Sequence, residues 1–292
     1  MNPINQETTS SYQIHIRPNK SWHHMNWHAI WEYRDLLFLL VRRDFVSKYK
    51  QTILGPLWFI LQPLATTIVF TVVFSRVARI PTDSIPPMLF YLCGLIGWMY
   101  FANCLNYTST TFVTNAGIFN KVYFPRLIIP FSVIISRFLA FIIQFVMFIG
   151  FYIFYKFFTP ASDTFHLNPA ALIFFPLLIM LTALLGLGMG LWLSALTAKY
   201  RDLTQLTTFL TSLWMYATPV IYPLSLIPAK WHKVMALNPM AGIVEAYRYC
   251  FFSVTVGNLF FYMLSSIIMT LIILISGILI FNKTERNFID TI

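Results

Sequence analysis

The sequence predicts an all-α integral membrane protein with about six transmembrane helices, and three observations support this fold class. Of the 292 residues, 58% are hydrophobic and 10% are charged, whereas soluble domains average about 25% charged residues. The mean hydropathy is +0.69. The apolar residues gather in runs long enough to cross a bilayer, which takes about 20 residues per helix. Lipid is the solvent that accepts so much apolar surface, so one membrane domain is expected.

Six apolar runs are predicted to span the membrane. Gly55 and Pro56 open the first, with proline at an early helix position where its missing N–H costs little. No segment between the runs is large enough to form a soluble domain. Residues 27–292 are therefore expected to form one transmembrane domain after a polar tail at residues 1–26, with spans near residues 56–77, 87–113, 127–155, 169–196, 203–222 and 259–281.

The basic residues outside the predicted spans indicate which side of the membrane each end faces. With the N-terminus placed in the cytoplasm, Lys and Arg are about twice as frequent in the inner segments as in the outer ones, as the positive-inside rule requires. An even number of spans then places the C-terminus inside as well. The same bias accounts for the net charge of +10, so the charge is not interpreted as a sign of nucleic-acid binding.

The segment before the first span differs from the spans. In residues 27–51 apolar side chains such as Trp27, Trp31 and Phe38 recur at helical spacing between charged ones. This segment is too charged to cross the bilayer. It is expected to form an amphipathic helix in the cytoplasmic interface, with its tryptophans at headgroup level. A solvated helix that packs on a partner protein is the alternative.

The segment between the fifth and sixth predicted spans, residues 223–258, is apolar but interrupted by prolines. It is too broken to cross the membrane twice. Short re-entrant helices that dip into the outer leaflet and return are expected here. Irregular backbone survives at that depth only where it packs against protein or lines water.

The distribution of reactive side chains argues against several classes of protein. No histidine or acidic residue lies in the core of a predicted span, where ion- or proton-coupled transporters place such groups and where a membrane glycan enzyme needs them. The three cysteines have neither metal-ligand nor disulfide spacing. No phosphate-binding loop of the form G-x-x-x-x-G-K-[ST] occurs. We therefore predict no catalytic residue, no metal site and no ATP hydrolysis by this chain itself.

Arg137 is the one charge well inside a predicted span, since Arg76 lies at the very end of the first. An arginine there either extends to the inner headgroups or pairs with a polar group inside the bundle. The sequence favours a structural role for it over contact with an anionic substrate.

Four motifs, spaced along the chain, together resemble the permease subunit of type-2 ABC exporters, in the branch that exports O-antigen and related polysaccharides. The resemblance covers about residues 27–285. The motifs are RRDFVSKYKQTILGPLWFILQPL from Arg42 to Leu64, NKVYFPRLIIP from Asn120 to Pro130, KYRDL from Lys199 to Leu203, and LNPMAGIVEAYR from Leu237 to Arg248.

The resemblance implies a homodimer in the bacterial inner membrane, with two copies of a separate ATPase subunit below it. That partner would bind ATP and Mg²⁺, and this chain would bind no cofactor of its own. The implied substrate is a polyprenyl-pyrophosphate-linked polysaccharide that moves from the cytoplasm across the membrane. Two alternatives stay open: the same fold exporting teichoic acid, capsule, lipid or drug, and an ATP-independent channel or secondary transporter.

Two groups of residues are predicted to act at the cytoplasmic side of such an exporter. The first group would receive motion from the ATPase through a short link between the second and third spans and through the flanking interface helix: Arg34, Asp44, Ile118, Phe119, Asn120, Lys121, Val122 and Tyr123. The second group would meet the pyrophosphate of the substrate, or simply attract anionic lipid, which is worth about 1 kcal/mol per basic residue: Arg42, Arg43, Lys48 and Lys50.

Two further groups are predicted along the path and at its outer end. Aromatic side chains near a span end are candidates to stack on sugars: Tyr91, Trp98, Tyr100 and Phe101. An outer gate is expected in the proline-broken segment, because a path wide enough for a sugar chain would otherwise leak ions, and a passive cap is the alternative. The gate residues are Pro219, Pro223, Pro239, Glu245 and Arg248, the last two being three residues apart and able to pair on one helix face.

Overall fold

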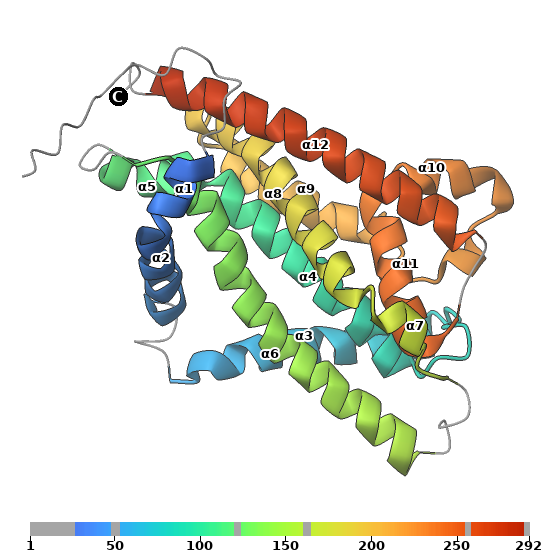
Figure 1. The fold of residues 1–292 in the computed structure, drawn as a ribbon. Coiled ribbons are helices and arrows are strands. Elements are labelled where there is room, and N and C mark those ends of the chain that lie inside the picture. The colour runs from blue at the N-terminus through green and yellow to red at the C-terminus, as the bar shows by residue number, and fades with distance from the viewer. Residues whose placement is uncertain (1–26, 48–52, 120–123, 160–164, 255–257, 289–292) are drawn as a thin grey trace, which may run out of the picture.

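The computed structural model describes residues 27–47, 53–119, 124–159, 165–254 and 258–288, and all regular elements in these ranges are helices. Five helical stretches are long and apolar enough to cross a membrane, which confirms the predicted all-α membrane fold. The long helices lie alongside one another and the short helices gather at their two ends (Figure 1). The five stretches are Gly55–Val77, Pro87–Ser109, Ile128–Phe158, Phe175–Lys199 and Leu259–Glu285.

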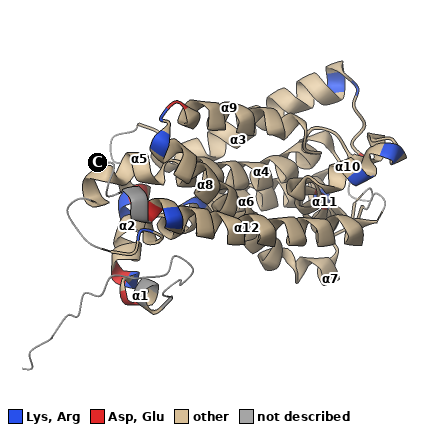
Figure 2. Cartoon of the chain, turned by 90° about the horizontal axis from the view of Figure 1, so that it is seen from above, with Lys and Arg blue, Asp and Glu red and all other residues tan. Residues whose placement is uncertain are grey.

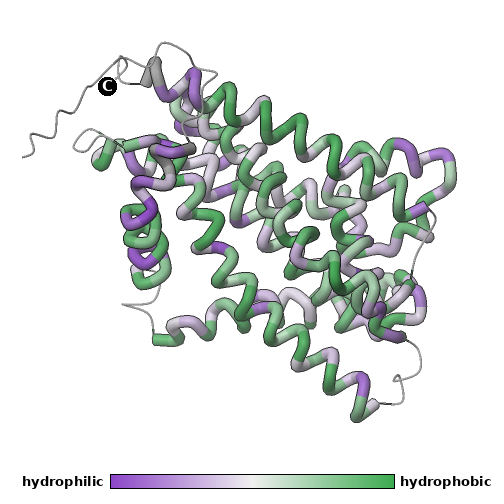
Figure 3. The backbone as a smooth tube through the Cα atoms, viewed as in Figure 1, coloured by the Kyte–Doolittle hydropathy of each residue, from purple (hydrophilic) through white to green (hydrophobic). Residues whose placement is uncertain are grey.

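Charged residues gather mostly at the two ends of this bundle (Figure 2). The hydropathy along the chain follows the same division, with mostly hydrophobic long helices (Figure 3). We call one end the α2 end, after α2 (Arg34–Ser47), which stands beside α5 (Thr111–Phe119). We call the other the α11 end, after α11 (Pro239–Phe252), which lies there with α10 (His232–Ala236) and α7 (Pro169–Leu172).

The first span is irregular and consists of η1 (Gly55–Leu57), α3 (Trp58–Phe70) and the π-helical η2 (Thr71–Val77). Pro63 lies inside α3 and has no N–H to donate. The hydroxyl of Thr67 donates to the Pro63 carbonyl at 2.7 Å, which further competes with regular helix bonding. Only 17% of the most apolar part of this span is buried within the chain, so lipid or another subunit must cover it.

The predicted second span ends earlier than expected. Helix α4 (Pro87–Ser109) ends before Thr110, and α5 continues from Thr111 in place of a single helix to residue 113. The hydroxyls of Ser109 and Thr110 donate to carbonyls three residues back, at 2.8 and 3.1 Å. Such local bonds favour a break in the helix.

The predicted fifth span is also shorter in the structure. Helix α9 (Leu203–Tyr216) ends at Tyr216 rather than at Tyr222, and turns follow it. Pro219 explains the end, because it has no N–H and its ring disfavours helical backbone in the residue before it. The predicted third span agrees to within a few residues with α6 (Ile128–Phe158), and α7 and α8 (Phe175–Lys199) together cover the fourth. Helix α12 (Leu259–Phe288) begins where the sixth span was predicted to begin and continues past its predicted end at residue 281.

Glycines let α8 approach two neighbours at once. A Cβ at Gly186 would lie 2.7 Å from the Cβ of Cys104 on α4, and one at Gly190 would lie 2.5 Å from Thr108 on the same helix. These two glycines are four residues apart and share a face. Gly188, between them, faces α12 instead, where its added Cβ would lie 2.8 Å from Leu274. Small residues spaced in this way allow close helix packing in membranes.

Helix α11 fills the interior at its end of the bundle. All of its residues are buried except Tyr249. It packs on α4, α8 and α12. Gly97 of α4 meets the ring of Tyr247, and Gly242 lets α11 touch the backbone of Tyr262 on α12. The re-entrant segment predicted between the last two spans therefore forms part of the core.

The N-terminal segment forms two helices rather than one. Helix α1 (Trp27–Glu32) and helix α2 are separated by a turn at Tyr33. Helix α2 packs on the beginning of α6. This contact places an amphipathic helix against the bundle, as a helix in the membrane interface requires.

Candidate functional site

Helix α2 is seated by a small apolar cluster. Leu40 is buried against Phe124, Ile128 and Ile129, at the beginning of α6, and Leu36 and Leu37 extend the contact. The opposite face of α2 is thereby turned outward. Arg34, predicted to take part in coupling, lies on that face, 3.9 Å from Asp35 and over the ring of Trp31.

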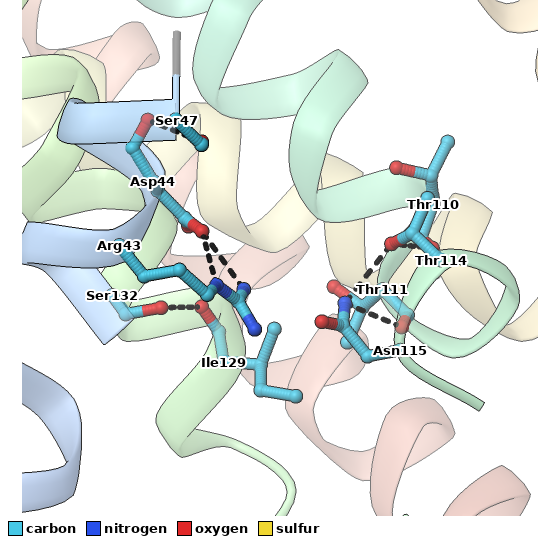
Figure 4. A network of polar contacts seen from close by, with 9 residues as sticks. All are labelled: Arg43, Asp44, Ser47, Thr110, Thr111, Thr114, Asn115, Ile129 and Ser132. Atoms are coloured by element: carbon cyan, nitrogen blue, oxygen red, sulfur yellow. Dashed lines mark hydrogen bonds and ion pairs between the residues drawn. The ribbon is translucent and has the colours of Figure 1, made fainter. Parts of the chain in front are cut away.

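The basic residues predicted to meet a phosphate group occupy the same helix. Arg42 and Arg43 are exposed. Arg43 donates two hydrogen bonds to Asp44, at 2.9 and 2.8 Å, and Figure 4 shows this pair beside the first turn of α6, near Ile129 and Ser132. The carboxylate of Asp44, which was predicted to take part in coupling, thus accepts hydrogen bonds from Arg43. Lys48 and Lys50 lie outside the described residues.

The predicted coupling link is described only up to its first two residues. Ile118 and Phe119 are half-buried. The Phe119 ring contacts Phe112 and Phe124, with centroids 6.0 and 5.8 Å apart, so part of it packs on its own chain. The rest of the link, residues 120–123 with Asn120, Lys121, Val122 and Tyr123, lies outside the described residues.

An ion pair that the sequence analysis missed lies beside this link. Arg126, in the turn just before α6, donates from Nη1 to the carbonyl of Glu285 at 3.0 Å, and its Nε lies 3.9 Å from the Glu285 carboxylate. The guanidinium also lies over the ring of Phe119, 5.0 Å from its centroid. The link between α5 and α6 is therefore tied to the last turns of α12. No pattern in the sequence relates residues 159 positions apart.

The aromatic residues predicted to stack on sugars are part of the core instead. Their exposed fractions are 0–3%. Trp98 meets Trp214 of α9 with centroids 6.0 Å apart, and Tyr100 meets Phe141 of α6 at 5.1 Å. Each ring is covered by neighbouring helices because α4 is the central helix of the bundle. Tyr91, Trp98, Tyr100 and Phe101 therefore stabilise the fold and offer no surface to a glycan in this structure.

Other aromatic rings are open to the outside of the chain. Trp58 of α3, Phe209 and Tyr216 of α9, and Tyr107 of α4 are each at least 40% exposed. Helix α9 buries Thr207 and turns Phe209 outward. The sequence held a signal for this orientation of α9, because threonines recur on one face of residues 203–216. The signal was not decisive, because in a membrane protein an apolar face can be covered either by protein or by lipid.

The residues predicted as an outer gate are all buried. Pro219, Pro223 and Pro239 lie at the turns that lead into and out of the α10 region. Glu245 and Arg248 do pair, with Arg248 Nη1 3.6 Å from the Glu245 carboxylate, and their side chains are 4% and 2% exposed. The pairing predicted from their spacing is therefore present, in a buried form.

Arg248 has two further partners that connect helices. Its Nη2 donates to the carbonyl of Val220 at 2.9 Å, in the turn that follows α9. Its guanidinium also stacks on the ring of Phe90 in α4, 3.6 Å from the centroid. A single buried cation thus holds α4, α9 and α11 together.

Arg137 of α6 is also buried, with 6% of its surface exposed. Its guanidinium carbon lies over the ring of Tyr107, 3.5 Å from the centroid. Tyr107 belongs to a polar stripe along α4 and α5 whose other members, half-buried or exposed, are Asn103, Asn106, Thr110 and Thr114.

Comparison with known protein families gives a match to one continuous region that includes elements from both ends of the bundle. A family model described as "ABC-2 type transporter" matches residues 35–252, from the beginning of α2 to the end of α11.

Three similar proteins illustrate the match. The O-antigen export system permease protein RfbA of Klebsiella pneumoniae is 28% identical over 257 residues, which cover 88% of this chain and 94% of that protein. The protein of the same name from Myxococcus xanthus is 28% identical over 226 residues, covering 76% and 82%. The polysialic acid transport protein KpsM of Escherichia coli is 24% identical over 217 residues, covering 73% and 79%.

Proposed function

Because the chain belongs to the ABC-2 type transporter family, we propose that it is the transmembrane subunit of an ATP-driven exporter of a lipid-linked polysaccharide. The cargo is a polyprenyl-pyrophosphate-linked glycan of the O-antigen kind, moved from the cytoplasm across the bacterial inner membrane. The observation that carries the proposal is the match to permeases named for O-antigen export, which covers 94% of the Klebsiella protein.

The proposal assigns catalysis to another protein. A separate ABC ATPase, in two copies, binds ATP and Mg²⁺ and hydrolyses the nucleotide, while this chain is non-catalytic. Both termini face the cytoplasm, so the α2 end meets the ATPase. Residues 118–123 and the outer face of α2 make the contact. The Arg126–Glu285 pair supports this placement, because it connects the contact region to α12.

Two copies of the chain form the path. The first span, buried only over 17% of its most apolar part, and the outward apolar face of α9 need cover. A second copy supplies that cover along a shared axis and encloses a passage between the subunits. The open rings of Trp58, Phe209 and Tyr216 then replace the four core aromatics as candidates to meet sugars.

Export of a capsular polysaccharide is the second candidate function. The similarity to a polysialic acid transport protein over 73% of this chain favours it. Both functions use the same fold and the same ATPase partner, and they differ in the glycan and its lipid anchor.

Depletion of the protein in its native bacterium tests the proposal. Lipid-linked glycan should accumulate on the cytoplasmic side, and the surface polysaccharide should disappear. Complementation with the wild-type gene should reverse both effects. Extraction of the accumulated material identifies the anchor and separates the two candidate glycans. Unchanged surface polysaccharide after depletion would contradict both.

The ATPase partner is tested by purification of the full chain from native membranes. An ABC ATPase should be recovered in equal amount, and its recovery should fall when Tyr123 is replaced by alanine. The matched control is Thr159→Ala, beyond the opposite end of α6. A transport activity that persists without any ATPase would identify a channel or secondary transporter instead.

A further inference from the structure

Arg137 lies deep in a membrane span, and the described part of the chain supplies no counter-ion to it. It is nine positions beyond Ile128, where α6 begins, and at a rise of 1.5 Å per residue this places it about 14 Å along the helix. Among the residues that the structure describes, no carboxylate lies within 4 Å of its side chain, and its buried Nε has no hydrogen-bond partner. A charged group at such depth is costly unless it is paired.

The surroundings of Arg137 hold its charge in place without neutralising it. The face of the Tyr107 ring supports the guanidinium at 3.5 Å, which is a cation–π contact. A ring contact of this kind makes no hydrogen bond to the guanidinium, and the buried Nε is without a hydrogen-bond partner among the described residues. Tyr107 is 40% exposed, so the site lies next to the outside of the chain.

A polar lane leads to this site from the α2 end. Thr114, Thr110, Tyr107 and Asn103 follow one another three or four positions apart, which places them on one face of α4 and α5. Asn106, beside them, accepts a hydrogen bond from Thr211 of α9 at 3.4 Å. The lane therefore runs along α4 at its contact with α9.

We propose that Arg137 binds the phosphate group of an anionic lipid inside the membrane, and that this lipid is the carrier of the exported glycan. The planar fork of an arginine matches phosphate oxygens and can bind them through two hydrogen bonds. A phosphate reaches this depth when it is attached to a lipid whose tail remains in the bilayer. The assignment of the lipid to the glycan carrier rests on the proposed function.

Photo-crosslinking tests the site in the purified full-length chain, held in nanodiscs of phosphatidylcholine. The probes are a diazirine-bearing polyprenyl diphosphate, the matching polyprenol without phosphate, and a diazirine-bearing phosphatidylglycerol. Labelling by the diphosphate should fall about tenfold or more in Arg137→Gln, since a hydrogen bond to a charged group is worth at least that factor. The control Arg76→Gln, at an exposed position at the end of the first span, should label like the wild type.

The outcomes separate the inference from the proposed function. Arg137-dependent labelling by polyprenyl diphosphate supports both. Arg137-dependent labelling by phosphatidylglycerol alone supports the phosphate site and contradicts the proposed cargo. Diphosphate labelling that Arg137→Gln leaves unchanged overturns the site, and so does equal labelling by the polyprenol.

A second measurement needs no variant of Arg137 and so does not depend on its folding. In the wild-type chain, the adduct of the phosphate-bearing probe should map by mass spectrometry to α4 near Tyr107 and to α6 near Arg137. An adduct confined to α2 or to the α11 end would overturn the site.

Discussion

Among the described residues, an Arg–Glu ion pair lies at each end of the bundle, and the two pairs are built differently. At the α11 end, Glu245 and Arg248 lie on the same helix, 3.6 Å apart, with side chains that are 4% and 2% exposed. At the α2 end, Arg126 and Glu285 come from distant parts of the chain and lie 3.9 Å apart, with 8% and 32% exposure. The first pair is enclosed by protein, and the second has one side open.

This difference indicates which end can move at low cost. A buried pair loses much free energy when it is separated, because each charge is left without solvent or partner. Arg248 also holds the turn after α9 through Val220, so α11 is fixed on several sides. If the α11 end opens, we expect the motion in the more exposed stretch from Leu224 to Ala236 and not in α11. The α2 end, with its partly solvated pair, is better suited to receive motion from a partner.

The largest predicted effect concerns the enclosed pair. Arg248→Met leaves the Glu245 carboxyl buried without its counter-ion, so we expect a loss of about 3–5 kcal/mol of stability. The measurement is the thermal unfolding of the purified protein in detergent. In the double variant Glu245→Leu with Arg248→Met, most of the stability should return, since an apolar pair replaces the ionic one. Equal melting temperatures for the single variant and the wild type would refute the enclosed-pair interpretation.

Close packing at the α11 end predicts the next effect. A Cβ at Gly97 would lie 2.5 Å from the Tyr247 ring, so Gly97→Ala should cost about 1–3 kcal/mol through overpacking. At the α2 end, Gly117 has no heavy atom within 4 Å of an added Cβ. Gly117→Ala should therefore be neutral or stabilise α5 by about 0.5–1 kcal/mol. Chemical unfolding of both variants under one condition compares the ends directly, and destabilisation of equal size in both would contradict the contrast.

A smaller change in stability and a larger change in function are expected at Glu285. Glu285→Gln removes one charge of a partly solvated pair, so stability should fall by about 1 kcal/mol at most. ATP-driven export should fall more than stability, because the link between α5 and α6 loses its tie to α12. Export assayed in cells with matched protein levels provides the measurement. Lys283→Gln, an exposed neighbour on the same helix, is the control, and export equal to that control would argue against a coupling role.

The smallest effect is predicted for Arg43. Its bond to Asp44 joins neighbours on an exposed helix face, and such pairs contribute about 0–1 kcal/mol. Arg43→Gln should leave thermal unfolding almost unchanged. If this variant were as unstable as Arg248→Met, the proposed difference between the two ends would not hold. A selective loss of export in Arg43→Gln would favour a role of this basic face in meeting the substrate headgroup.

Several features of the site were predictable from short stretches of sequence. The spacing of Glu245 and Arg248 predicted a pair on one helix face, and that pair is present. The helical recurrence of apolar residues predicted an amphipathic element before the first span, and α2 packs its Leu40 face on α6. By contrast, Tyr91, Trp98, Tyr100 and Phe101, predicted to line a sugar path, are buried in the core of the chain. Their burial was not predictable, because hydropathy does not distinguish a helix at the centre of a bundle from one at its surface.

The sequence by itself determined that the protein lies in a membrane, because 58% of its residues are hydrophobic and they form runs of membrane length, which require lipid around them. This was predictable because the hydropathy of a run depends only on residues adjacent in the chain. Only the tertiary structure decided which helix lies in the middle and which charges meet. Arg126 and Glu285, which pair, are 159 positions apart in the sequence. Arg137 meets the ring of Tyr107 on α4, and no carboxylate among the described residues, only because of the way α6 packs on α4. Both follow from the packing of helices that are distant in the chain, where close fit is decided by side-chain shape rather than by local pattern.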